Sequence, residues 1–298
     1  MLSRRTFFKQ ISLLAASSAI LPYAMDKAMA SSSFLQQTEP TDEEILRAKF
    51  VAAMKRYLKD REIGDVVATM GVLFSGAPYV AKSLEAGGPE HLVVNLRGFD
   101  CVTFIESTLA LSRCIKARTE TFEAYKKQLQ FIRYRSGVID EYPSRLHYFS
   151  DWIDDNDRKA VVRNITKALG GERYPKEINF MSTHPSAYRQ LSSPIHFRVV
   201  KAWEKEINKR EHFFIPKDRV VSIQDKIRDG DIIAITSAID GLDVGHTGLA
   251  IHYQGGLKYL HAPLSKGSVQ VSGQSLVDYL KANKKGTGIM IARPLEPV

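Results

Sequence analysis

Cysteine and long apolar segments are scarce in this chain of 298 residues. Its two cysteines, Cys101 and Cys114, are too few for a disulfide scaffold and form none of the paired spacings typical of zinc sites. The apolar stretch at residues 11–24 is shorter than the roughly 20 residues that a membrane-spanning helix needs. Hydrophobic residues still make up 44% of the chain, which excludes a disordered or fibrous protein. A functional sulfur would therefore be a free thiol.

Positive charge is in excess but is not concentrated in a block. Lys and Arg number 42 against 33 Asp and Glu, a net charge of +9. Because basic residues lie beside acidic ones, an anionic partner is favoured without being identified. The sequence has no nucleic-acid-binding motif, and we expect no nucleic-acid partner.

The N-terminus has the features of an export signal. Arg4 and Arg5 precede the apolar stretch at 11–24, and the small-residue triplet at 28–30 follows it. Paired arginines, an apolar stretch and a cleavage site in this order are typical of a twin-arginine signal. We expect cleavage after Ala30, no stable membrane insertion afterwards, and a periplasmic or secreted protein. The alternative is a chance Arg-Arg pair before an amphipathic helix.

The rest of the chain predicts a linker at 31–41 and one α+β domain at 42–298. Apolar residues recur at helical intervals from 42 to 58, over 98–115 and over 122–132, and Ser193-Pro194 predicts a helix that runs to about Asn208. Later segments rich in Ile, Val and Tyr predict strands at 231–235, 246–253, 257–261 and 288–292. Helices followed by strands indicate an α+β fold with an antiparallel sheet.

Cys101 is the first candidate for chemistry. Gly98 and Asp100 are helix-start residues, so the cysteine falls in a first helical turn. The unpaired N–H groups and the dipole there are expected to lower the pKa of the thiol and to bind an oxyanion. The alternative is a small buried residue. We give that role to Cys114, which lies about 20 Å further along the same helix, too far for a disulfide.

A nucleophilic cysteine needs a base, and His246 is the best placed of the eight histidines because it begins a strand between two glycines. His261 lies on the next strand of the same hairpin. If the loop is centred at 253–254, the two histidines face each other, and His261 accepts from the Nδ1–H of His246. A turn centred at 255–256 would instead pair His261 with Ala250. A further alternative is a zinc site of His246, His252 and His261. We expect no metal and no cofactor, because the chain has no His-Glu-x-x-His pattern and a zinc site would leave Cys101 unused.

The segments around Cys101, His246 and His261 resemble those of the NlpC-type cell-wall hydrolases, which are papain-like cysteine enzymes. The matching segments, in the expected order, are 76–79, 99–101, 228–233, 246–251 and 260–262. The resemblance implies that Cys101 is the nucleophile, His246 the base and His261 the residue that orients it. It also implies that the phenol of Tyr79 lies near the oxyanion site.

Three further features resemble one branch, the N-acetylmuramoyl-L-alanine amidase-like proteins. Val102-Thr103 replaces the usual Ser-Gly, 145 positions separate Cys101 from His246, and Glu106 and the segment 179–185 match the branch. We expect a monomeric or weakly associating protein. The branch implies cleavage of the amide between N-acetylmuramic acid and L-alanine in peptidoglycan or muropeptides. It also implies an enlarged helical insertion at about 115–212. Alternatives are a stem-peptide endopeptidase of the same fold, a zinc-dependent hydrolase, and a wall-binding module with a decayed site.

The insertion is where we expect substrate selection. Residues 133–152 are rich in aromatic and arginine side chains, which suit sugar rings and the carboxylates of a muramyl peptide. The alternative is an amphipathic helix with a basic exposed face. The residues expected to contact substrate are Tyr79, Asn95, Arg97, Asp100, Tyr134 and His184.

Overall fold

The computed structural model of the protein describes residues 39–85 and 87–297. The expected export signal at 1–30 and most of the linker lie outside these ranges. Within them, no helix is long and apolar enough to cross a membrane. Residues from Pro40 onward form one compact unit.

Polar side chains begin the helices that the sequence predicts. Thr41, Asp100, Thr121 and Ser193 each accept a hydrogen bond from the first turn that follows them, which satisfies N–H groups that have no partner inside the helix. The described helices are α1 (Asp42–Lys55), α2 (Ile63–Leu73), α3 (Cys101–Lys116), α4 (Phe122–Arg133), α5 (Phe149–Arg158), α6 (Phe180–Thr183), α7 (Pro194–Asn208) and α8 (Leu276–Ala282).

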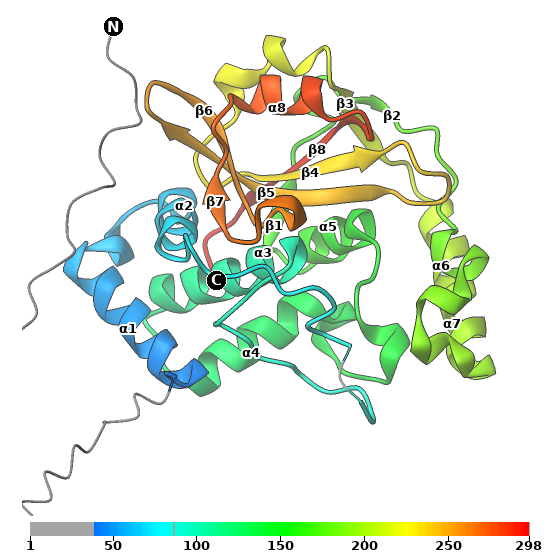
Figure 1. Cartoon of the computed structure of the whole chain (residues 1–298), viewed down its shortest axis with the longest axis horizontal. Helices are drawn as coiled ribbons and strands as arrows, with labels where there is room; N and C mark the ends of the chain where they lie inside the picture. The colour runs from blue at the N-terminus through cyan, green and yellow to red at the C-terminus, as the bar shows by residue number, and fades with distance from the viewer. Residues whose placement is uncertain (1–38, 86, 298) are drawn as a thin grey trace, which may run out of the picture. The chain divides into compact units, whose positions relative to one another are not determined.

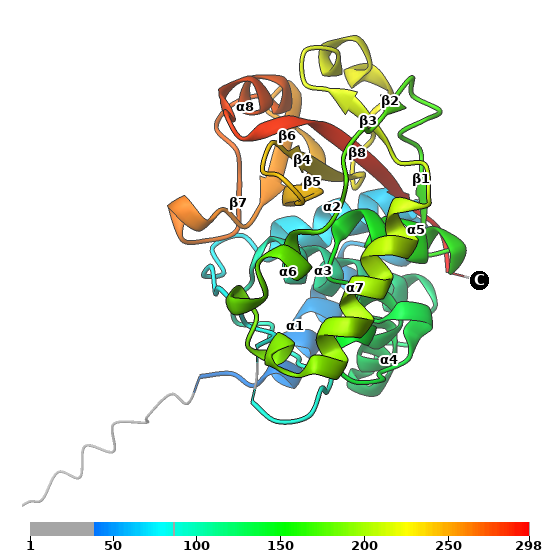
Figure 2. The ribbon, with the colours of Figure 1, turned by 90° about the vertical axis from the view of Figure 1, so that its right-hand side faces the viewer.

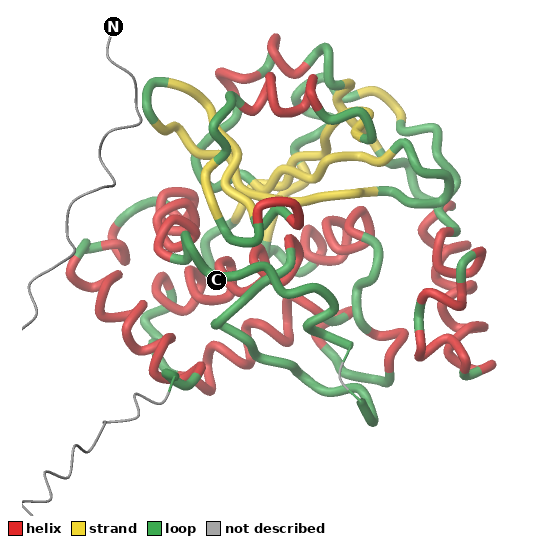
Figure 3. Tube along the Cα trace, in the orientation of Figure 1, coloured by secondary structure: helices red, strands yellow, loops and turns green. Residues whose placement is uncertain are grey.

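The strands form one antiparallel sheet in the order β2-β3-β8-β4-β5-β6-β7, with β1 also paired to β8. Figure 1 and Figure 3 show α2 to α5 on one side of this sheet and α8 on the other. The turned view in Figure 2 shows the same layers. The strands are β1 (Val162–Asn164), β2 (Glu172–Arg173), β3 (Phe213–Pro216), β4 (Ile232–Ser237), β5 (Val244–Tyr253), β6 (Gly256–His261), β7 (Gln270–Val271) and β8 (Gly286–Pro294).

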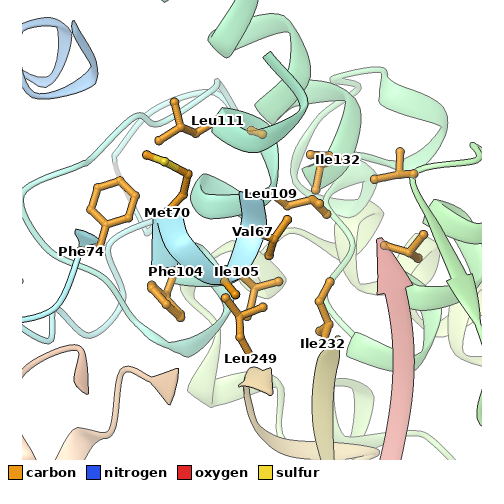
Figure 4. Packing of buried hydrophobic residues seen from close by; sticks show 14 of the residues in the cluster. Val67, Met70, Phe74, Phe104, Ile105, Leu109, Leu111, Ile132, Ile232 and Leu249 are labelled. Atoms are coloured by element: carbon orange, nitrogen blue, oxygen red, sulfur yellow. The ribbon is translucent and has the colours of Figure 1, made fainter. Parts of the chain in front are cut away.

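Helix α3 occupies the centre of the larger core, between the other helices and the sheet. Figure 4 shows Phe104 and Ile105 of this helix beside Leu249 of β5, with Val67 of α2 next to them. Alternate residues of the same strands point to the opposite face and form a second core with α8. Because α3 is buried along nearly its whole length, its first residue is held firmly against the sheet.

The expected α+β class with an antiparallel sheet is confirmed, and the predicted strands correspond to β4, β5, β6 and β8. Helices α2, α5, α6 and α8 and the short strands β1, β2, β3 and β7 were not anticipated. The region 115–212 contains α4 to α7, but it also contributes β1 and β2 to the sheet. Strands of two or three residues have too little periodicity to be detected in a sequence.

Candidate active site

Cys101 is the first residue of α3, where the sequence predicted it. The preceding Asp100 caps this helix, since its Oδ1 accepts hydrogen bonds from the N–H groups of Val102 at 3.0 Å and Thr103 at 2.8 Å. Two of the donors expected to stabilise a thiolate or an oxyanion are therefore already engaged. Asp100 itself, an expected substrate contact, holds the first turn of α3 with one carboxylate oxygen.

Strand β5 reaches the start of α3 through Thr247. The Thr247 hydroxyl donates to the main-chain carbonyl of Cys101 at 2.9 Å, and hydrogen bonds from Thr247 also act on the thiol. His246 directly precedes Thr247, so β5 carries both the candidate base and the residue that contacts Cys101. Sequence reasoning missed Thr247, whose only signal was its place beside His246.

The two histidines are joined across the β5–β6 hairpin: Nε2 of His246 lies 2.7 Å from Nδ1 of His261. The hairpin pairs Tyr253 with Gly256, so its turn lies between the two alternatives left open by the sequence. Continuing this register places His261 opposite Gly248, diagonally across from His246 on the same face. Diagonal neighbours of this kind lie within reach of ring side chains.

The nitrogen that His246 uses differs from the expectation. Its Nε2 atom, not Nδ1, faces His261. When Nε2 of His246 carries the proton and donates it to Nδ1 of His261, Nδ1 of His246 has a free lone pair. That tautomer can accept a proton from a thiol, whereas the opposite tautomer, with a proton on Nδ1, cannot.

The electrostatics also differ from the expectation of a lowered thiol pKa. Burial, with a smaller contribution from Asp100, raises the pKa of Cys101 to about 11, although hydrogen bonds from Thr247 act in the opposite direction. Burial lowers the pKa of His246 to about 4. Desolvation thus outweighs the helix-start effect, partly because Asp100 already occupies two N–H groups of the first turn. Near neutral pH the thiol and the imidazole are both uncharged.

Tyr79 lies close enough to Cys101 for the two side chains to interact electrostatically, while its place at an oxyanion site stays a prediction. Tyr79 forms an isolated parallel β-bridge with Phe99, which lies two residues before Cys101. The N–H of Tyr79 donates to the carbonyl of Gly267. Burial and the proximity of Cys101 and Asp100 raise the pKa of its phenol. The phenol therefore stays protonated and can donate a hydrogen bond near the sulfur.

Comparison with known proteins identifies the family. A family model described as AmiA-like, N-acetylmuramoyl-L-alanine amidase-like, matches residues 69–289. The chain belongs to this family. A crystal structure of an N-acetylmuramoyl-L-alanine amidase from Bacteroides uniformis is 38% identical over 78% of this chain and 99% of its own, with a TM-score of 0.75.

Two other solved structures are also similar to this amidase-like protein. One, described as a putative xylanase from Bacteroides fragilis, is 38% identical over 76% of this chain and 99% of its own, with a TM-score of 0.71. The other, a Legionella pneumophila protein of the family model DUF1460, is 20% identical over 86% of this chain and 96% of its own. At that identity, its TM-score of 0.63 shows a shared fold alone. A comparison with curated proteins gave no match.

Of the other expected substrate contacts in this amidase-like protein, three stabilise local structure. The side chain of Asn95 accepts from the N–H of Arg97, and Arg97 forms an ion pair with Asp42 at 3.3 Å. Tyr134 is buried, and its hydroxyl donates to Glu90 at 2.7 Å.

His184 differs from these three because its side chain is exposed. Its ring stacks on Phe180 with 4.3 Å between centroids. Asn179 and Phe180 in turn donate their N–H groups to the carbonyl of Gly241, in the loop between β4 and β5. His184 therefore lies on a segment that is hydrogen-bonded to the β4–β5 connection, and β5 also bears His246.

The segment 133–152 matches neither of its two interpretations. Tyr134, Tyr142, Tyr148 and Trp152 are buried and cannot stack on a sugar. Two of its arginines reach inward to the loop before α3: Arg133 donates to the carbonyl of Val93, and Arg145 donates to that of Leu84. The third, Arg135, forms an ion pair with Asp151. Arg133 and Arg145 hold the residues that lead to Cys101.

The three histidines of the zinc alternative do not converge. His252 lies near the other end of β5, about 20 Å from His246 at strand rise, where its Nδ1 is 2.7 Å from Asp229. In the described part of the chain, no group of three or more His, Cys, Asp or Glu side chains is arranged to hold a metal ion.

Proposed function

We propose that this protein is a cysteine-dependent amidase that cleaves the bond between N-acetylmuramic acid and L-alanine in peptidoglycan or muropeptides. Cys101 is the nucleophile, His246 the base and His261 the residue that orients the base. The observation that carries this assignment is the 2.7 Å contact between Nε2 of His246 and Nδ1 of His261, on a strand that contacts Cys101 through Thr247. Membership of the amidase-like family supports the substrate class.

The reaction begins from a neutral pair. The Cys101 sulfur attacks the lactyl amide carbonyl while Nδ1 of His246 takes the thiol proton, and His261 stabilises the imidazolium that forms. The phenol of Tyr79 donates to the oxyanion, together with the N–H of Cys101. The proton on His246 passes to the departing amine as the C–N bond breaks, which leaves a thioester.

Water completes the cycle. His246 takes a proton from the attacking water, the thioester C–S bond breaks, and the sulfur recovers its proton from His246. The products are the muramic acid carboxylate and a peptide with a free L-alanine amine. This sequence needs no cofactor, and the enzyme is proposed to act as a monomer.

Two other activities can be distinguished from the proposed amidase activity. A stem-peptide endopeptidase would use the same centre on a different amide, so only the product distinguishes it. A glycosidase, in line with the description of the Bacteroides fragilis structure, would need two carboxyl groups about 5 to 10 Å apart across the bond. The centre here combines a thiol with two imidazoles, which favours acyl transfer.

Mass spectrometry of a defined muropeptide digest tests the proposal. We expect an intact peptide that begins with L-alanine, together with the sugar that retains its lactyl carboxylate. Fragments cut within the stem would replace the amidase with the endopeptidase, and cleaved glycan with an intact lactyl amide would overturn both.

The twin-arginine signal places this activity outside the cytoplasm in our proposal. Replacing both Arg4 and Arg5 with lysine should leave the protein in the cytoplasm on cell fractionation. Unchanged export of the variant would contradict this part of the proposal.

A further inference from the structure

Two tyrosine rings enclose the imidazole of His261. The Tyr259 ring lies 4.7 Å from it, tilted by 32°, and the Tyr279 ring lies 5.1 Å from it at 81°. The two tyrosines also contact each other, at 5.2 Å, and Tyr259 meets the ring of His246 at 5.8 Å. The histidine pair is therefore packed against aromatic rings from two different elements.

Tyr279 comes from α8, which lies on the opposite face of the sheet from α3 (Figure 1). Its neighbours Leu276, Val277 and Leu280 are buried in the same core as Tyr259, and Ser275 caps the helix. These contacts fix α8, so the place of the Tyr279 ring is well determined. Tyr279 itself is only half-buried, as expected for a residue at the boundary between the core and a site.

The orientation of His261 matters because only one side of its ring offers a nitrogen to His246. A half-turn about the Cβ–Cγ bond would exchange Nδ1 for a carbon and break the 2.7 Å contact. His246 would then be free to place its proton on Nδ1, where it blocks transfer from the thiol. A ring held on two sides resists this rotation, since interiors of native density leave no room for it.

We propose that Tyr279 is a positioning residue of the reaction centre: its ring, together with that of Tyr259, keeps His261 from rotating and so preserves the Nε2–H tautomer of His246. The inference rests on the proposed function and adds to it a residue outside the matched segments. The proximity of Cys101 contributes, after burial, to a raised pKa of Tyr279, which agrees with a place close to the centre. Tyr259 is anchored independently, because its hydroxyl donates to the carbonyl of Ile233.

The experiment compares three variants of the full mature chain. Tyr279→Ala removes the ring, and Tyr279→Phe keeps the ring without the hydroxyl. Val220→Ala removes packing from the same core but from a segment outside α8, so the contacts that hold Tyr279 remain. For each variant we measure kcat and KM on a muropeptide and the protonated nitrogen of His246 by 15N NMR.

We expect Tyr279→Ala to lower kcat about 10- to 100-fold, with KM changed less than about threefold, because the reacting groups lose their alignment. Its NMR spectrum should show neutral His246 as two tautomers in exchange, with the single ring proton on Nδ1 in one and on Nε2 in the other. Tyr279→Phe should restore kcat and the single Nε2–H form. Val220→Ala should lower stability but keep kcat per folded molecule.

Two outcomes would overturn the inference: wild-type kcat with a single tautomer in Tyr279→Ala, or a loss in Tyr279→Phe equal to that in Tyr279→Ala. A wild-type protein that cleaves no muropeptide would defeat the proposed function instead. The NMR comparison would still decide whether Tyr279 holds the imidazole pair.

Discussion

The Thr247 hydroxyl donates to the main-chain carbonyl of Cys101 at 2.9 Å, although 146 positions separate the two residues. This contact joins the first turn of α3 to the strand that carries His246. One hydrogen bond thereby connects the element that bears the cysteine with the element that bears the candidate base. Sites built on helices and strands hold their geometry better than sites on loops.

The first prediction concerns this contact. Thr247→Val keeps the shape of the side chain but removes the hydroxyl, which leaves the first turn of α3 less firmly placed and removes a hydrogen bond that lowers the thiol pKa. A neutral hydrogen bond is worth about 1 kcal/mol, so we expect kcat/KM to fall about fivefold or more. Thr247→Ser keeps the hydroxyl and should retain activity. A loss in Thr247→Ser with full activity in Thr247→Val would show that the methyl group, not the hydrogen bond, matters.

The second prediction separates the two cysteines. Cys101→Ala should abolish muropeptide cleavage and leave the melting temperature nearly unchanged, because removing one half-buried sulfur creates at most a small void. Cys114→Ala is the matched control. Its sulfur is buried far along α3, so this variant should lose some stability and remain active. Muropeptide cleavage by Cys101→Ala would refute the proposed role of Cys101 as the nucleophile.

The third prediction concerns pH. Because the pKa of His246 is lowered to about 4, the base stays neutral in mildly acidic solution, and kcat/KM should fall only as pH drops toward 4. Alkylation of Cys101 by iodoacetamide should rise with pH toward about 11, where the thiol ionises. Cys101→Ala, whose remaining thiol is buried, corrects for background labelling. A preformed thiolate–imidazolium pair would instead give rapid alkylation that is constant from acidic to neutral pH.

Local sequence signals predicted where the main helices and strands of the site begin, whereas contacts between distant residues could not be predicted. Asp100 and Ser193 are caps that act within three residues, so the starts of α3 and α7 could be read from the sequence. Helix α2 has no side-chain cap and is apolar on most of its surface, so no stripe marked it. The role of Tyr134 depends on Glu90, 44 positions away, and no local pattern contains that pairing.

The register of the β5–β6 hairpin could not be predicted from the sequence either. Both histidines were identified, but their relation depends on a shift of one residue in the turn, which changes the partner of every residue on β6. The observed turn places Gln254 and Gly255 at positive φ, 49° and 78°, as the tight two-residue connection requires. Glycine was present at two adjacent positions, so the sequence did not distinguish among the possible turns.

The fourth prediction concerns the buried ion pair between Arg133 and Glu106 of α3. Nε of Arg133 lies 2.6 Å from Oε2 of Glu106, both side chains are 2% exposed, and Arg133 also donates to the carbonyl of Val93 in the loop that leads to Cys101. Arg133→Met leaves Glu106 buried without its partner, which should lower the free energy of unfolding by about 3 to 5 kcal/mol.

Chemical denaturation measures this loss, and two further variants test its origin. The double variant Arg133→Met with Glu106→Gln should be less destabilised than Arg133→Met alone, because no unpaired charge remains buried. Arg47→Met breaks a matched but exposed pair with Glu43 and should change stability by less than about 1 kcal/mol. If the double variant is as unstable as Arg133→Met, the loss comes from the released loop and not from the stranded carboxylate.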